Sequence, residues 1–288
     1  MDNSTMTEVF VRRMQAEDLT EGLRLTQAES WSYRLEDWSL HFRLGQGWVA
    51  CDAGGRVLGT AIWWRYGEQF ATVGLVVVDR HQQGKGIGRK LMHAVMEDAG
   101  ARSLQLVSTR AGRRLYEQCG FREQGAIDQH QGVPVAAPPA HEPAAASLRA
   151  VTSADVATIT RWDAISFGTD RTPVIAAVLE TGEGKGILAE RHGRLAGYAL
   201  ARPAGRGTTI GPVVAEDERL AIEMIARMLQ RRTEIMRLDI PADATVLGGW
   251  LESAGIARVD RAAAMVRGMP MPRGGTARVF GLVSQALT

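Results

Sequence analysis

One pattern occurs twice along the chain, and this internal repeat limits the folds that the sequence can adopt. Five positions of the first half recur with the same residue 135 to 138 positions later. They are Arg12 and Arg149, Asp18 and Asp155, Gly59 and Gly197, Gly74 and Gly211, and Gly120 and Gly255. Matches that keep nearly one register across most of each half indicate a duplicated structural unit. We therefore expect two copies of one fold, each of the size of an ordinary domain.

The segment between the copies has the composition of a linker. Residues 133–147 read VPVAAPPAHEPAAAS, which is rich in alanine and proline and has no apolar periodicity. Proline lacks a backbone donor, and a segment rich in it does not continue a helix or a central strand. We predict a first domain over residues 1–132, a linker over 133–147, and a second domain over 148–288 that includes a C-terminal extension.

Strand and helix patterns alternate within the first copy. Short apolar runs typical of strands cover residues 9–12, 48–51, 57–64, 71–78, 103–107 and 121–126. Helical spacing covers residues 19–42, a stretch that begins near residue 86, and residues 112–119. Strands before, between and after helices predict an α/β fold, with a mixed sheet and helices on both of its faces. The repeat then predicts two such domains in tandem.

Charge, hydropathy and cysteine content exclude several classes of function. The chain has 34 Lys and Arg against 32 Asp and Glu, a net charge of +2, which is too low for a broad nucleic-acid-binding face. No apolar run approaches the ~18 residues that span a bilayer, and the polar N-terminus is unlike a signal peptide. Cys51 and Cys119 lack metal-binding spacing, and the six histidines form no metal-binding pair. We expect a cytoplasmic monomer or homodimer without a metal, a membrane or a nucleic-acid partner.

A glycine-rich segment, QQGKGIG at residues 82–88, lies between a predicted strand that ends at Val78 and a predicted helix that begins near Gly86. Backbone amides at the start of a helix attract anions, and glycine lets the backbone approach them closely. The segment is therefore either a phosphate-binding loop or a plain turn from strand to helix. A similar string, GEGKGI at residues 182–187, follows a predicted helix and leads into a strand, so we expect a turn there.

Two segments resemble the GNAT superfamily of N-acetyltransferases. VVVDRHQQGKGIGRKLM resembles its acetyl-CoA-binding signature, Gln/Arg-x-x-Gly-x-Gly/Ala, with Gln83, Gly86 and Gly88 at the fixed positions. RRLYEQCGFRE resembles a later segment in which a helix carries a tyrosine just before a strand. The resemblance covers residues 8–132 well, and the second half resembles the C-terminal domain of tandem GNAT proteins in outline.

The resemblance implies an acetyl-CoA site. In such a site one strand of the sheet splays away from its neighbour, and the glycine loop holds the pyrophosphate of CoA through backbone amides. Basic side chains meet the outer phosphates. The residues at these positions are Val76, Val77, Val78, Gln83, Gly84, Lys85, Gly86, Ile87, Gly88 and Arg89. Thr109 stands where the family often has an asparagine that contacts pantetheine, so this contact is weakened or lost. Tyr116 is implied as the general acid near the CoA sulfur, and its structural alternative is a buried tyrosine that packs the helix on the sheet.

Aromatic residues characterise the acceptor side. Trp31 and Tyr33 lie in the connection between the first two helices, which lines the acceptor pocket in this superfamily. Trp63 and Trp64 point to opposite faces of a strand, so one must be core, and we predict that Trp64, with Trp31 and Tyr33, lines the pocket. Plain core packing is the alternative for all three. No general base is assigned, because Glu29, Glu68, Asp79 and His81 are each more typical of a solvated loop charge than of a base.

The second copy has lost these features. At the position of the glycine loop it reads AEDER, residues 215–219, and Leu251 replaces Tyr116. We predict that residues 148–270 do not bind CoA in the family manner. The resemblance implies a transferase, an N-acetyltransferase that moves acetyl from acetyl-CoA to a primary amine of a small-molecule or amino-acid-like acceptor. A non-catalytic acyl-CoA sensor and a protein or peptide N-acetyltransferase are the alternatives.

Overall fold

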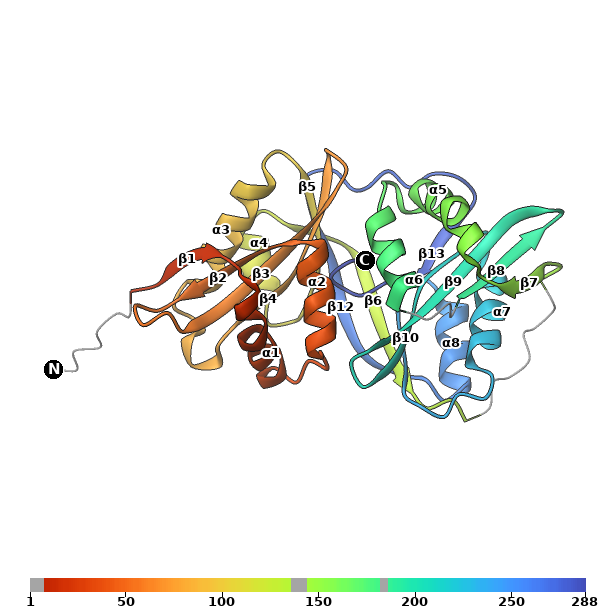
Figure 1. The fold of residues 1–288 in the computed structure, drawn as a ribbon, viewed down its shortest axis with the longest axis horizontal. Coiled ribbons are helices and arrows are strands. Elements are labelled where there is room, and N and C mark those ends of the chain that lie inside the picture. Colours follow the sequence, from red (N-terminus) through yellow and green to blue (C-terminus); the bar gives the residue numbers. More distant parts are fainter. Residues whose placement is uncertain (1–7, 136–143, 182–185) are drawn as a thin grey trace.

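A computed structural model describes residues 8–135, 144–181 and 186–288, and it shows two similar halves placed side by side (Figure 1). The helices of the first half are α1 (Leu19–Ala28), α2 (Leu35–Leu44), α3 (Ile87–Ala99) and α4 (Arg113–Gln118). Its strands are β1 (Phe10–Arg13), β2 (Gln46–Cys51), β3 (Val57–Tyr66), β4 (Phe70–Val78), β5 (Ser103–Ser108) and β6 (Arg122–Gly132).

The second half repeats this order and adds a final strand. Its helices are α5 (Val156–Phe167), α6 (Thr172–Thr181), α7 (Glu218–Leu229) and α8 (Thr245–Ser253). Its strands are β7 (Ser147–Ala150), β8 (Gly186–Arg191), β9 (Arg194–Ala204), β10 (Gly207–Ala215), β11 (Met236–Pro241), β12 (Ala257–Arg267) and β13 (Arg278–Gly281). The glycine string at residues 182–187 lies mostly outside the described residues. No helix in the described part of the chain is long and apolar enough to cross a membrane.

The duplication predicted from the sequence is visible in matching contacts. Arg12 forms a salt bridge with Asp18 at 2.7 Å, and the corresponding Arg149 forms one with Asp155, also at 2.7 Å. In both copies the carboxylate also caps a short 3₁₀ turn just after the first strand. The fold is therefore a mixed α/β sheet protein with two similar units, as the sequence predicts.

The two halves share one sheet through an exchange of strands. The order is β1-β2-β3-β4-β5-β12-β6-β11-β10-β9-β8-β7, and β13 pairs separately with β10. The last strand of the first copy, β6, pairs with β11 of the second, while β12 of the second copy pairs with β5 of the first. β6 and β12 also pair with each other. Each copy thus contributes a strand that pairs within the other half, and the sheet does not divide at the predicted domain limits. Those limits therefore stay a prediction from the sequence.

This exchange explains the one strand whose length the sequence does not predict. Residues 121–126 are the predicted strand, whereas β6 continues to Gly132. The additional residues pair with β11 from Ile127 onward and with β12 on the other side. Strand partners from the distant copy therefore extend β6, although its second half is polar.

Helices cover both faces, and the cores of the two halves merge on one of them. α3 and α4 pack on one face of the first half. On the opposite face, Trp38 of α2 and Ile175 of α6 belong to one continuous core that includes Leu287 near the end of the chain. Figure 1 shows α2 and α6 facing each other between the halves, with the C-terminus at the centre. The halves are thus packed together as one unit.

The C-terminal segment after β13 lies against two equivalent glycines of the repeat. A side chain at Gly74 of β4 would meet the Cβ atom of Ala286 at 2.7 Å. One at Gly211 of β10 would meet the carbonyl oxygen of Leu282 at 1.8 Å. Glycine is required at both positions because the segment approaches both strands so closely.

Candidate active site

β4 and β5 diverge and leave an opening in the sheet of the first half. They pair in parallel only from Phe70 to Thr72, opposite Ser103 to Gln105. Val76, Val77 and Val78 lie farther along β4, where the pairing with β5 has ended. An unpaired strand edge presents backbone N–H and C=O groups to any ligand that enters. The predicted splay is present at the predicted residues.

A β-bulge reshapes β4 at this opening. The pairing with β3 shifts between Thr60 opposite Val77 and Ile62 opposite Gly74, so that β4 has an additional residue. Leu75 has a φ of +50°, a sparsely populated conformation for a residue with a side chain. Its carbonyl accepts a hydrogen bond from the buried Thr60 hydroxyl at 2.7 Å. Bulges of this kind redirect backbone groups and often occur beside active sites.

The glycine loop stands at the mouth of the opening. Gly84 and Gly86 have φ values of +77° and +80°, and no atom lies within 4 Å of the position a Cβ would take at either. Gly86 is the residue that precedes α3, so the first amides of this 13-residue helix adjoin the open face of the loop. A helix N-terminus preceded by left-handed glycines is a suitable site for a phosphate group.

Side chains hold the loop in place. Gln83 donates hydrogen bonds to the Val78 carbonyl at 3.1 Å and to Glu29 at 3.3 Å. Lys85 and Arg89 are exposed, and Arg89 donates to Gln118 of α4 at 2.8 Å. Ile87 is buried in the core, so only its backbone is available to a ligand. The structure thus brings the predicted cofactor-binding residues together around one opening.

Tyr116 lies on α4 beside this loop. Its neighbour Leu115 would touch a side chain at Gly88, at 3.0 Å, which places α4 against the start of α3. The Tyr116 ring is buried and packs edge-on against Phe121, with 6.0 Å between ring centroids. Burial, and to a lesser degree Cys119, raises the pKa of Tyr116, so its hydroxyl stays protonated at neutral pH. The tyrosine therefore packs the helix and also retains a proton that it can donate.

Thr109 occupies the turn that precedes α4. Its hydroxyl accepts a hydrogen bond from the Gly112 amide at 3.2 Å. A side chain at Gly112 would meet Tyr116 at 2.9 Å and Thr109 at 3.4 Å, so these two predicted site residues flank the same glycine. The hydroxyl of Thr109 thus has a local structural role in the turn.

The corresponding opening of the second half is occupied by the chain itself. β10 and β11 pair only at Thr208 and Thr209. Beyond that point β13 pairs with residues 213–215 of β10. At the position of the glycine loop, Asp217 caps α7 by accepting from the Leu220 amide at 2.9 Å. Leu251, which replaces the tyrosine, is fully buried.

The predicted acceptor-side aromatic residues form a chain of ring contacts through His41. Ring centroids are 6.5 Å apart for Trp31 and Tyr33, 5.8 Å for Tyr33 and His41, and 5.2 Å for His41 and Trp64. The ring of Trp64 would lie 3.2 Å from a side chain at Gly74. The chain of rings therefore leads from the α1–α2 connection to the bulge of β4.

The prediction that Trp64 lines the pocket is wrong. Trp64 is 1% exposed, and its indole N–H donates to the His41 carbonyl at 3.0 Å. Trp63, on the other face of β3, is equally buried and donates to Asp98 at 2.8 Å. Because helices cover both faces of β3, both indoles are core residues. Trp31 and Tyr33 remain half-buried at the junction of the two halves.

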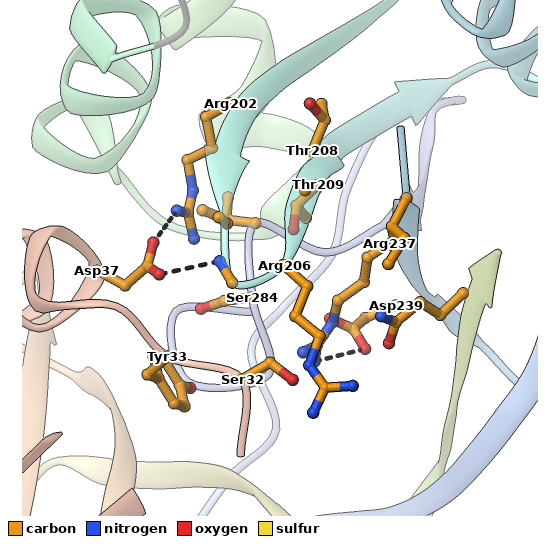
Figure 2. Close-up of a pocket in the computed structure, with 16 residues that line it drawn as sticks. Ser32, Tyr33, Asp37, Arg202, Arg206, Thr208, Thr209, Arg237, Asp239 and Ser284 are labelled. Carbon is orange, nitrogen blue, oxygen red and sulfur yellow. Dashed lines mark hydrogen bonds and ion pairs between the residues drawn. The ribbon is translucent and has the colours of Figure 1, made fainter. Parts of the chain in front are cut away.

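A pocket lies where the α1–α2 connection meets the hairpin between β9 and β10 (Figure 2). It is lined by Ser32 and Tyr33 from the first half and by Arg202, Arg206 and Arg237 from the second. Residues 283 and 284 of the C-terminal segment complete its wall. The sequence did not indicate these arginines or the C-terminal residues as site residues. They come from separate segments of the second copy, and no local pattern connects them.

The possible bases near the site are engaged in structural contacts. Glu68 pairs with Arg65 and Arg102 in the β3–β4 turn, next to where β4 and β5 are still paired. Burial raises the pKa of Asp79, but hydrogen bonding to the His81 amide and the nearby Arg24 and Arg56 bring it below its usual value. Within the described residues, no group of three His, Cys, Asp or Glu side chains is arranged to hold a metal ion.

Comparison with known proteins identifies the family. Models of the GNAT acetyltransferase domain match both halves, at residues 43–123 and at residues 159–281. The chain belongs to the GNAT acetyltransferases and carries two GNAT domains.

Individual relatives agree with this assignment. The chain is 26% identical over 222 residues to YitH of Bacillus subtilis, described as an uncharacterized N-acetyltransferase, and the match covers 76% of this chain and 77% of YitH. The fold is similar to that of a Pyrococcus horikoshii protein assigned to the acetyltransferases, with a TM-score of 0.77 and 18% identity over 100% of this chain and 99% of that one. The fold is also similar to that of a tandem GNAT protein from the clavulanic acid biosynthesis pathway. The TM-score is 0.62 and the identity is 16%, over 91% of this chain and 100% of that one.

Proposed function

We propose that this protein transfers an acetyl group from acetyl-CoA to a primary amine of a small-molecule or amino-acid-like acceptor, and that it does so in the cytoplasm. The observation that carries the proposal is the combination of the opening between β4 and β5 with the glycine loop at its mouth. Neither feature is present in the second half, where β13 and Asp217 take their places. The protein therefore has one acetyl-CoA site per chain.

The first half offers suitable groups for each part of the cofactor. Free backbone groups at Val76 and Val78 would pair with the pantetheine amides, and the amides from Gln83 to Gly88 would hold the pyrophosphate. When bound, acetyl-CoA supplies an acetyl group activated as a thioester. Backbone amides beside the Leu75 bulge would stabilise negative charge on the thioester oxygen.

Tyr116 would supply the proton for the departing sulfur. The new N–C bond forms as the C–S bond breaks, so the sulfur leaves with an electron pair and needs a proton. A thiol has a lower pKa than a phenol, so proton transfer from Tyr116 to the departing thiolate is uphill. It would be completed when the phenolate takes up the proton that the attacking amine loses. Burial raises the pKa of Tyr116 and keeps the hydroxyl in its donating form.

A thiol-release assay with acetyl-CoA and a panel of primary amines tests this proposal, with the wild-type protein and with Tyr116→Phe. The wild-type protein should release CoA with at least one amine. The variant should lose roughly a hundredfold in kcat, a typical contribution of general acid catalysis. Its affinity for acetyl-CoA should be unchanged, because the aromatic ring and its packing remain. Acetyl-CoA binding without turnover of any amine would instead indicate a sensor.

A further inference from the structure

The pocket between the halves has more positive than negative charge in its wall. Three arginines and two aspartates line it, Arg202, Arg206, Arg237, Asp37 and Asp239. Hydroxyl groups from both halves and from the C-terminal segment surround them, on Ser32, Tyr33, Thr208, Thr209 and Ser284. The lining therefore carries a net charge of +1 and many hydrogen-bond donors, and it is suited to a singly charged anion.

The aspartates of this wall are already saturated by donors. Asp37 accepts from Arg34, from Arg202 at 3.1 Å and from the Gly205 amide at 3.0 Å. Asp239 accepts from Arg237 at 3.0 Å and from the side chain of Gln285 at 3.0 Å. Both carboxylates thus fix the positions of the basic side chains and leave little capacity to bind a cationic ligand.

The arginines, in contrast, retain unused donors. The Arg202 side chain is only 4% exposed, and its Nε atom has no hydrogen-bond partner among the described residues. Arg206 stands in the hairpin between β9 and β10, and within the described part of the chain it forms no hydrogen bond or salt bridge. Figure 2 shows Arg202 paired with Asp37 on one side of the pocket, and Arg206 beside Arg237 on the other.

The pocket is close to the bulge where acetyl transfer would occur. Ser284 lines the pocket, and Ala286 contacts the position of Gly74. Two residues of extended chain span at most about 7 Å, which limits the distance between these points. The ring contacts from Tyr33 through His41 to Trp64 connect the same two places. The pocket and the bulge of β4 are therefore neighbours, with Ala286 and the ring of Trp64 packed against the strand at Gly74.

We propose that this pocket binds the carboxylate of the acceptor, mainly through Arg206, and that the preferred acceptors are therefore amino acids. The inference rests on the proposed acetyl transfer and specifies its substrate class. A cavity of about 40 Å³ has room for a group of a few atoms, which fits a carboxylate better than a whole substrate. The net charge of +1 also matches a carboxylate better than a phosphate.

Kinetics on amino acids, their amides and the corresponding decarboxylated amines test the proposal. The wild-type protein should show a kcat/KM at least about tenfold higher for an amino acid than for its amide. Arg206→Ala should lower this value roughly ten- to hundredfold for the amino acid, the usual effect of losing a hydrogen bond between charged groups. It should leave the amide within about twofold. Arg194→Ala is the control, because Arg194 is an exposed arginine at the other end of β9.

Binding to the CoA-loaded protein gives a second, independent measurement. N-acetyl amino acids should bind by calorimetry more tightly than their amides, and Arg206→Ala should remove the difference. Equal activity on acids and amides, equal losses for both in the variant, or the absence of binding would overturn the proposal. Inhibition by inorganic phosphate at lower concentrations than by acetate would instead show a phosphate site. Arg206-dependent binding without turnover would refute the acetyl transfer and leave the carboxylate pocket in place.

Discussion

His41 is expected to make the protein sensitive to mild acid. Its side chain is fully buried between Tyr33 and Trp64, and neither ring nitrogen has a hydrogen-bond partner among the described residues. Burial, reinforced by the positive charge of Arg202 and opposed by Asp37, lowers the pKa of His41 to about 3. The ring is therefore neutral in the folded protein over the whole physiological range.

The size of the effect follows from the difference between the folded and unfolded states. In the unfolded chain an ordinary histidine binds its proton near pH 6.5. Between pH 6.5 and about 3 the unfolded state binds a proton at His41 that the folded state does not, so stability falls as the pH falls. From pH 7 to pH 5 this costs about 2 kcal/mol. Most carboxylates titrate below pH 5, and comparison with a variant at position 41 separates His41 from the other five histidines.

Urea unfolding followed by tryptophan fluorescence at pH 7, 6 and 5 measures the effect, with His41→Phe as the comparison. Phenylalanine keeps an aromatic ring between Tyr33 and Trp64, and the backbone carbonyl that accepts from the Trp64 indole is unchanged. The wild-type protein should lose about 2 kcal/mol of unfolding free energy over this range. The variant should lose about 2 kcal/mol less than the wild-type protein does. Parallel pH profiles for the two proteins would refute the reasoning.

Three further predictions concern the site and its frame. Gly86→Glu should abolish CoA binding, whereas Gly193→Glu should not. Both positions have left-handed φ values, +80° and +71°, and open surroundings. Equal losses of binding would contradict a single loop site. Calorimetric titration with CoA should give one site per chain, because β13 occupies the second opening, and a stoichiometry of two would disprove this. Cutting the chain within residues 133–147 should leave the halves associated on gel filtration, because β6 and β12 are hydrogen-bonded to the opposite halves. Elution as separate halves would show that the strand exchange is not needed for either half to fold.

The parts of the site that depend on local backbone chemistry could be predicted from the sequence. Gly84 and Gly86 adopt left-handed conformations that other residues rarely take, so their spacing indicates a loop of defined shape. Arg12 and Asp18, which recur in the second copy, contact each other and are only six residues apart in the chain. Such short-range signals survive in a single sequence, because the residues that make the contact are also the residues that form the pattern.

Contacts between distant segments could not be predicted in this way. The alternation of a strand specifies which face is buried but not which strand lies beside it, so β12 gives no sign that it pairs with β5. The C-terminal residues resemble an ordinary apolar end, yet Ala286 packs against Gly74 and Leu282 against Gly211. The burial of Trp64 could not be predicted for the same reason. The helix that covers it is α2, where the accepting carbonyl of His41 lies 23 residues earlier in the chain.

The strand exchange shows how the second copy contributes to the proposed CoA site of the first. β5 forms one side of the opening, but it pairs with β4 at only three positions. It is held instead by β12, which pairs with it from Leu104 to Ser108. The second copy therefore fixes the width of the opening in the first. It also supplies Arg206 to the pocket and Ala286 to the bulge of β4, so that the proposed catalysis in one half would depend on the other through the backbone as well as through side chains.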